Sequence, residues 1–469
     1  MNLLDCNEDV VRSILGCLAQ ADLRSVCLTH SHLRRLAESF LYSTIEIAFP
    51  KYATPPIPSL VGTILRRPEL AAYIRTLLFK GGHPGSWAGG GRQVPKLSVR
   101  GPDRLAAISF VEKTRLSYRG TWIEELRRGT LDAYLAVLIS QLPRLQRLHL
   151  GCCFFIENDL IGRVLRSIIS GSDADLSPPG IHTTLHQLHT VTLEGFVSRY
   201  NGIDDRGTRN TVNALPFFYL PSLRKMSASI DNPLVPTFPW PTPQPPSASS
   251  LTSLSVVTIR ESHLGELLAP LPHLRSLSWT WAFDPDFEDQ FNSPIINLDL
   301  LMPALQHVRG TLAELNITAL CYYANRAATP FPLQVQGSLR ALSGFDHLTK
   351  LVIPLAFLTG FSLPVRELLA NCLPRSLEEL TLADDLYIHT DINEEWEEAG
   401  YTGAIVTWLA DVRTSTPRLR KLCLVLMSPD GEVSFEYLSI RNEIRELGRQ
   451  RAIEVTAKVV YESGEQLAH

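Results

Sequence analysis

The chain of 469 residues lacks several features that would place it in a functional class. Its eight cysteines form no Cys-x-x-Cys pair, so neither a zinc site nor a disulfide framework is indicated. No block of lysine and arginine occurs and the formal net charge is -4, so the electrostatic footprint of a nucleic-acid-binding protein is missing. No run of about 18 apolar residues occurs, and the N-terminal MNLLDCNEDVV is acidic where a signal peptide is basic. These absences predict a soluble protein of the cytoplasm, the nucleus or both, with no nucleic-acid or membrane partner.

Signatures of nucleotide binding and of nucleophilic hydrolysis are missing as well. The chain contains no G-x-G-x-x-G, no G-x-x-x-x-G-K-[ST] and no G-x-S-x-G, and its glycine cluster at 81–91 lacks a following Lys-Ser/Thr. Cys153 comes directly after a predicted strand, where a satisfied turn thiol is favoured over a nucleophile. The acidic run at 394–398 has no apolar sequence around it and indicates a solvated helix start.

The best candidates for metal ligands are three histidines in IHTTLHQLH. His182 and His186 are four residues apart and would share a helix face, and His189 follows them. No acidic residue lies between the first two as in H-E-x-x-H, and the neighbouring leucines suit the edge of a strand, so surface histidines are favoured. The sequence therefore predicts no catalytic residue, no metal and no cofactor. A histidine-metal hydrolase is kept as a distant alternative.

What the chain does contain is ample apolar material for a folded core. Hydrophobic residues make up 45% of the chain and charged residues 20%, which is typical of globular proteins. Because 469 residues exceed the size at which a single core keeps growing, the length predicts several domains or an elongated repeat array.

A spacing of apolar residues recurs along most of the chain. Leu145, Leu148 and Leu150, followed by Cys153 and Phe155, fit the leucine-rich repeat pattern L-x-x-L-x-L-x-x-N/C-x-L. In each copy x-L-x-L-x predicts a short strand with one buried side, and stacking such strands in parallel buries a continuous core. The first part of the pattern recurs at Leu188/Val191/Leu193, Leu223/Met226/Ala228, Leu254/Val257/Ile259, Leu274/Leu277/Trp279, Leu312/Leu315/Ile317, Leu348/Leu351/Ile353, Leu377/Leu380/Leu382, Leu419/Leu422/Leu424 and, more weakly, Ile74/Leu77/Phe79.

The copies are unevenly spaced and mostly lack the polar Asn/Cys of the pattern. We therefore expect an α/β fold in which residues 60–469 form an irregular solenoid, with parallel strands on its concave face and helices or loops on the convex side. Loop insertions are expected at about 81–130, 231–250 and 383–400, where Gly-rich, Pro-rich or acidic segments interrupt the pattern. Solvated insertions without a partner are favoured there over binding loops.

Residues 1–48 carry apolar residues at helical spacing instead. Three short helices are predicted, the third with Leu33, Leu36, Phe40 and Leu41 on its apolar face. A block of this size cannot bury all of these side chains by itself, so part of its apolar surface must meet the repeat array or another protein. The candidate N-caps are Asn7 or Asp5 for the first helix, Asp22 for the second and Ser31 for the third.

The order of residues in this block resembles the F-box, the small helical module that docks on the Skp adaptor of SCF-type cullin-RING ubiquitin ligases. The resemblance covers about residues 3–47, and the chain has Asp5 where the family usually has proline after its first leucine. It rests on Leu4, Ile14 with Leu18, Asp22-Leu23, the run Val26-Cys27-Leu28 and the closing Leu41-Tyr42-x-x-Ile45, a form common in fungal F-box proteins.

An F-box followed by leucine-rich repeats implies a substrate receptor whose partners are a Skp-type adaptor, the cullin scaffold through it, and a target protein held by the repeats. The sequence does not separate adaptor-facing residues from core residues within the block. The alternative is a stand-alone leucine-rich repeat scaffold for protein interaction, with the N-terminal helices as a cap on the array. The resemblance implies an adaptor-binding and core surface made of Leu4, Val10, Ile14, Leu15, Leu18, Leu23, Val26 and Leu28.

A target would bind to the outward x positions of x-L-x-L-x, which line the concave face of a leucine-rich array. Positive, negative and neutral residues are mixed among these positions, so their charge does not indicate a class of target protein. The candidates are Arg147, His149, Thr192, Lys225, Ser227, Ser278, Asn316, Lys350, Thr381 and Lys421.

Overall fold

The computed structural model divides the chain into two compact units. Unit 1 comprises Met1–Phe196, Arg206–Ser229 and Trp240–Ser250, and unit 2 comprises Val197–Asp205, Ile230–Pro239 and Leu251–His469. The residues that the structure describes are 6–48, 55–81, 96–97, 99, 101–155, 158–170, 185–194, 211–234, 238–247, 249–283, 291–321, 333–359, 365–383, 386, 405–428, 435–461 and 466–467.

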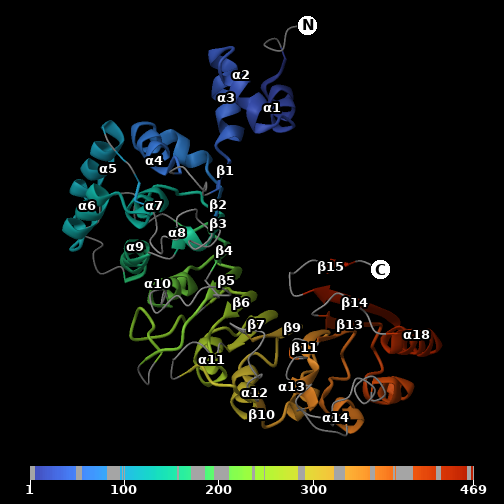
Figure 1. Ribbon diagram of the computed structural model, residues 1–469. Helices are drawn as coiled ribbons and strands as arrows, with labels where there is room; N and C mark the ends of the chain where they lie inside the picture. Colours follow the sequence, from blue (N-terminus) through green and yellow to red (C-terminus); the bar gives the residue numbers. More distant parts are fainter. Residues whose placement is uncertain are drawn as a thin grey trace. The chain divides into compact units, whose positions relative to one another are not determined.

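Unit 1 begins with a helical block made of α1 (Glu8–Gly16), α2 (Gln20–Cys27) and α3 (Ser31–Leu41), shown in blue in Figure 1. The side chain of Asn7 accepts a hydrogen bond from the backbone N–H two residues on, at 3.0 Å, and so caps α1 as predicted. The block has a hydrophobic core of its own. Its buried members are Val11, Leu15, Leu23, Leu33, Leu36 and Ala37.

The two other predicted caps are wrong by a few residues. Asp22 lies inside the first turn of α2, whose N-cap residue is Ala19, and there it stabilises the helix through the dipole. Ser31 is the first residue of α3. The cap is His30, whose Nδ1 accepts a hydrogen bond from the backbone N–H of His32 at 3.2 Å.

The rest of unit 1 is a parallel sheet with helices on one side of it (Figure 1). Its strands follow the order of the chain, from β1 to β5. The strands are β1 (Thr44–Ala48), β2 (Thr76–Lys80), β3 (Arg147–Leu150), β4 (Thr190–Leu193) and β5 (Lys225–Ser229). The helices between them are α4 (Ile57–Arg66), η2 (Pro68–Tyr73), α5 (Pro102–Lys113), α6 (Arg119–Arg128), α7 (Leu131–Ser140), α8 (Cys152–Phe155), α9 (Asp159–Ser170), α10 (Thr211–Ala214) and η4 (Leu215–Tyr219).

The middle residues of the predicted repeats are direct neighbours across this sheet. Leu77 pairs with Leu148, Leu148 with Val191, and Val191 with Met226. All of these side chains are buried. The leucine spacing in the sequence therefore corresponds to the register in which neighbouring strands pair.

Unit 2 has the same architecture, again with parallel strands and helices between them. Its strand order is β6-β7-β9-β11-β12-β13-β14-β15, and β15 runs antiparallel to β14. The main-sheet strands are β6 (Ser253–Val257), β7 (Ser276–Phe283), β9 (Glu314–Cys321), β11 (Lys350–Pro354), β12 (Glu379–Ala383), β13 (Lys421–Ser428), β14 (Glu454–Tyr461) and β15 (Gln466–Leu467). A separate small sheet pairs β8 (Ile295–Asn297) with β10 (Gln334–Gln336). Its helices include α11 (Glu261–Leu268), α12 (Leu298–Gln306), η5 (Arg340–Gly344), α13 (Leu355–Thr359), α14 (Val365–Cys372), α17 (Val412–Ser415) and α18 (Phe435–Gln450).

One predicted repeat of unit 2 is shifted by three residues. Leu254 pairs with Leu277 and therefore occupies the middle position, where the sequence analysis places Val257. Leu251 is the leading buried leucine of this copy, and Val256 is the last. The error arises because apolar residues fit the repeat spacing in both alignments, the one that starts at Leu251 and the one that starts at Leu254. Spacing alone therefore does not distinguish them.

The sheet and the predicted insertions also differ in extent from the sequence analysis. The strand order starts at β1, ahead of residue 60, where the predicted array begins. Part of the predicted 81–130 insertion is helical, since α5 and α6 lie in it. Of the Gly-rich segment 81–96 on which that prediction rests, only residues 81 and 96 are described. Farther along, Gly101 precedes a proline at the first position of α5, and Gly129 ends α6 in the left-handed conformation.

The remaining insertions are only partly covered by the described residues. The described parts of 231–250 contain no helix or strand. Of the segment 383–400, only Ala383 and Leu386 are described, so the acidic run within it lies outside the described residues.

Candidate protein interaction surfaces

The structure divides the predicted F-box residues into two groups, of which the first forms the core of the helical block. Leu15 and Leu23 are buried, and Leu18 and Val26 are half-buried against the same cluster. These four side chains hold the three helices together. A polar replacement among them therefore disrupts folding before it affects any partner.

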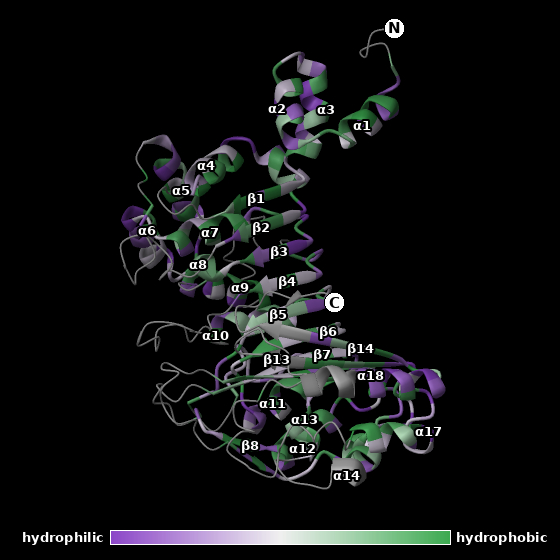
Figure 2. Cartoon of the chain, turned by 45° about the vertical axis from the view of Figure 1, so that its right-hand side comes forward, coloured by the Kyte–Doolittle hydropathy of each residue, from purple (hydrophilic) through white to green (hydrophobic). Residues whose placement is uncertain are grey.

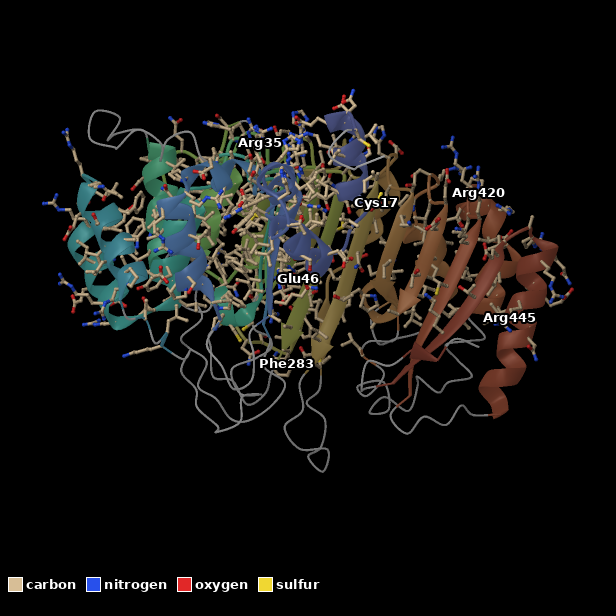
Figure 3. All side chains as sticks on the ribbon, turned by 90° about the horizontal axis from the view of Figure 1, so that it is seen from above. Cys17, Arg35, Glu46, Phe283, Arg420 and Arg445 are labelled. Carbon is tan, nitrogen blue, oxygen red and sulfur yellow. The ribbon has the colours of Figure 1, made fainter. Side chains whose placement is uncertain are left out.

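The second group lies at the surface. Val10 is 50% exposed, Ile14 42% and Leu28 88%. Val10 and Ile14 are four residues apart in α1 and share one side of the helix, and α1 carries both hydrophobic and hydrophilic residues in Figure 2. Leu4 lies outside the described residues. Figure 3 labels Cys17 and Arg35, which both belong to the helical block.

The helical block is attached to the rest of unit 1 by a strand and by a cluster of charges. β1 follows α3 directly and pairs with β2. The buried carboxylate of Glu38 accepts two hydrogen bonds from Arg67, at 2.8 and 2.7 Å, and one from Arg34 Nε at 2.9 Å. The two hydrogen bonds from Arg67, followed by the one from Arg34, lower the pKa of Glu38 to about 2 despite its burial. No local pattern in the sequence marks Glu38 or Arg67.

In each unit the outward residues of the strands lie on the face that the helices leave uncovered, which we call the open face (Figure 1). In unit 1 one row across this face contains Arg147, Thr190 and Lys225 in register, and the next contains His149, Thr192 and Ser227. Arg147 and Lys225 are exposed, and neither has a carboxylate partner in the described part of the chain, although Arg147 Nε donates to Thr76 Oγ1 at 3.3 Å. The open face of unit 1 therefore presents two cations without a counter-charge among the described residues, beside the pairs of His149 with Glu194 and of Lys80 with Glu46.

The open face of unit 2 instead pairs its charges from strand to strand. Lys350 Nζ lies 3.0 Å from Glu379, and Lys421 Nζ lies 3.3 Å from the other oxygen of the same carboxylate. The hydrogen bond from Lys350 is the main cause that lowers the pKa of Glu379. The row continues the alternation of sign, in the order Glu314, Lys350, Glu379, Lys421 and Glu454.

The other predicted residues of unit 2 form the next row on the same face. Ser278 and Asn316 are neighbours, and Asn316 Nδ2 donates to Ser278 Oγ at 3.3 Å. Thr381 lies in the same row on β12. The structure thus brings the predicted target-binding residues together within each unit, five in unit 1 and five in unit 2.

The candidate nucleophile and metal ligands form no common site, and His189 directly precedes β4, with its Nδ1 3.1 Å from Thr190 Oγ1 on the open face of unit 1. Cys153 is buried in α8, and burial raises the pKa of its thiol to about 12. His186 is exposed and His189 half-buried, whereas His182 lies outside the described residues. Within the described ranges, no three or more His, Cys, Asp or Glu side chains gather so that they could hold a metal ion.

Comparison with known proteins agrees with the repeat architecture of parallel strands and helices. The family model of the leucine-rich repeat domain matches residues 102–432. The chain belongs to this family. Leucine-rich repeat domains typically bind other proteins and carry no catalysis of their own. No curated protein matches the sequence.

The matched range of this leucine-rich repeat protein starts after the helical block and after β1 and β2. In the part of the chain that the structure describes, no helix combines the length and apolar character needed to cross a bilayer.

Proposed function

We propose that this leucine-rich repeat protein is the substrate receptor of an SCF-type cullin-RING ubiquitin ligase. The helical block binds a Skp-type adaptor, and through it the cullin scaffold, while the open face of the repeats holds a target protein. Ubiquitin transfer takes place on other subunits. The receptor contributes by raising the effective concentration of the target near the ubiquitin-charged enzyme, so it needs no cofactor. On this proposal the protein works in the cytoplasm, the nucleus or both.

The observation that supports adaptor binding best is the exposed apolar surface of a block that already has its own core. Val10, Ile14 and Leu28 are not needed to hold the three helices together, because they lie outside the buried cluster. Apolar anchors of this kind, projecting from helices, are what a helix-in-groove contact uses. Each anchor contributes about 1.5 to 3 kcal/mol when it is fully buried.

Co-expression of the full chain with a fungal Skp adaptor tests this proposal. We expect the adaptor to co-purify in a fixed ratio, and a chain that begins at Ser43, which keeps β1 but lacks the helical block, to recover none. Soluble full-length protein that never retains the adaptor would remove the receptor proposal.

A stand-alone scaffold with a helical cap is the second candidate, and the attachment of the block favours it. The pairing of β1 with β2 and the ion pair between Glu38 and Arg67 join the block to the repeats as a cap would be joined. This candidate makes the opposite prediction for co-expression, because a cap needs no adaptor.

Charge reversal on the open face of unit 1 is expected to separate target binding from adaptor binding. Arg147→Glu combined with Lys225→Glu replaces two exposed, unpaired cations by carboxylates, while both residues lie outside the helical block. We expect the amount of target that co-purifies with the double variant to be at least about tenfold lower than with the wild type. The amount of co-purified adaptor should not change. Quantitative mass spectrometry of the two purified complexes measures both. An unchanged set of target proteins would count against this face.

A further inference from the structure

On the helical side of unit 1, a hollow of about 510 Å³ lies between three helical elements. Its walls come from the turn before α6, from α9 and from α10. The lining is mostly polar, with two arginines and a single carboxylate. The lining residues are Ser117, Tyr118, Asp159, Arg163, Arg166, Ser167, Val212 and Asn213.

Arg166 is the central cation of this hollow. It is half-buried and forms no ion pair with a carboxylate in the described part of unit 1. It donates to the carbonyl of Gly162 at 3.3 Å and to Asn213 Oδ1 at 3.1 Å. Burial lowers its pKa, and the charge of Asp159, which is paired with Arg163, offsets this only in part. A desolvated cation that faces an open hollow is a favourable place for an anionic ligand.

The side chain of Arg166 is held in place by a chain of amides. Asn213 Nδ2 donates to Asn158 Oδ1 at 2.9 Å, and its own Oδ1 accepts from Arg166. Asn213 can approach α9 so closely because Gly162 has no side chain, and a Cβ there would overlap it. The guanidinium is therefore oriented before any ligand arrives, which lowers the entropy cost of binding.

Arg163 lies one turn earlier on α9 and is less tightly held. Its Nε is 2.8 Å from Asp159, and its guanidinium carbon is 5.9 Å from the centre of the Tyr118 ring. The hydroxyl groups of Tyr118 and Ser167 are 3.2 Å apart. Val212, which is 41% exposed, adds an apolar surface to the polar lining.

We propose that this hollow binds an organic phosphate monoester. Arg166 and Arg163 hold the phosphate, with the Ser167 hydroxyl as a further donor, and the ring of Tyr118 and the side chain of Val212 contact the organic part. A monoester carries between one and two negative charges at neutral pH and offers three oxygens to the forked donors of arginine. The volume exceeds what a bare phosphate fills and lies in the range of small-molecule sites.

Isothermal titration calorimetry of the full-length chain with phenyl phosphate tests the proposal, and inorganic phosphate at equal ionic strength is the second arm. We expect phenyl phosphate to bind more tightly than inorganic phosphate, since only the ester reaches Tyr118 and Val212. Arg166→Gln should weaken binding of phenyl phosphate by about tenfold or more, and Arg166→Lys should be intermediate, because lysine keeps the charge and loses the fork. The matched control is Arg127→Gln, on the exposed surface of α6, and should change the affinity by less than about twofold.

The partly exposed Arg163 provides a second variant that does not depend on the folding of Arg166→Gln. Arg163→Gln is expected to weaken phenyl phosphate about threefold to tenfold. The site is overturned if phenyl phosphate does not bind up to about 10 mM, or if both arginine variants bind it like the wild type. Equal affinity for phenyl phosphate and inorganic phosphate would overturn the assignment of an organic ligand. Neither readout involves the adaptor, so failure here is distinct from failure of the receptor proposal.

Discussion

Ile14→Asp combined with Leu28→Asp is expected to weaken binding of a Skp-type adaptor by about 100-fold or more while leaving the fold of unit 1 intact. Two apolar anchors of about 1.5 to 3 kcal/mol each are lost, and every 1.4 kcal/mol corresponds to about tenfold in affinity. Both side chains lie at the surface of the helical block, so the unfolding free energy should change by less than about 1 kcal/mol. Titration of the purified chain with adaptor by calorimetry measures the affinity, and circular dichroism during heating measures the fold.

Two further variants separate loss of contact from loss of structure. Ser13→Asp also introduces a carboxylate on α1, but at an exposed polar position. The affinity of this variant for the adaptor should be within about twofold of the wild-type value. Leu23→Asp should instead unfold the block, because Leu23 is buried among its helices. If the Ile14 and Leu28 variant keeps full affinity, the exposed apolar surface is not the adaptor site.

Glu38→Gln is expected to lower the unfolding free energy of unit 1 by about 2 to 3 kcal/mol at pH 7. The carboxylate is buried and carries three hydrogen bonds from Arg67 and Arg34. The variant leaves Arg34 without its counter-charge and leaves Arg67 paired with the exposed Glu69 alone. Because this pair joins α3 to the segment before η2, the block should also become less protected from hydrogen exchange. Urea denaturation gives the free energy, and exchange of the α3 amides reports the block.

The same pair makes stability depend on pH in a defined window. The pKa of Glu38 falls from 4.5 to about 2 on folding, chiefly because Arg67 hydrogen-bonds to the charged form. The folded state therefore binds the proton more weakly than the unfolded state, and the stabilisation, on the order of 3 kcal/mol, is fully present above pH about 4.5. It is lost as the pH falls toward about 2. The difference between wild type and Glu38→Gln should shrink correspondingly between pH 5 and pH 3.

The surface pair of Glu46 and Lys80 is the matched control for Glu38. It has an equally short contact of 2.7 Å, but both side chains are more than half exposed (Figure 3 labels Glu46). Glu46→Gln should cost less than about 0.5 kcal/mol at any pH in this range, since water screens the pair. Equal effects at the two positions would mean that burial of Glu38 does not matter.

The leucine spacing by itself predicted the parallel sheet and most of its register. Leu148, Val191, Leu315 and Leu380 all occupy the middle position that the repeat pattern assigns to them. A buried face with a period of two residues leaves few other registers, because a slip of one residue would turn the apolar side chains to water. The exception is the repeat at Leu254, whose segment fits the leucine spacing in two alignments three residues apart. There the pairing with β7 determines which alignment the strand adopts.

Only the tertiary structure decided which residues of the helical block are core and which are surface. Leu23 and Leu28 have the same side chain, yet one is buried and the other almost fully exposed. Helical spacing places apolar residues on a face but does not say what covers that face. Contacts between segments far apart in the sequence, such as Glu38 with Arg67 and Arg166 with Asn213, leave no local pattern. They depend on how the helices pack against the sheet, and this is why the charge cluster and the polar hollow of unit 1 were not visible in the sequence.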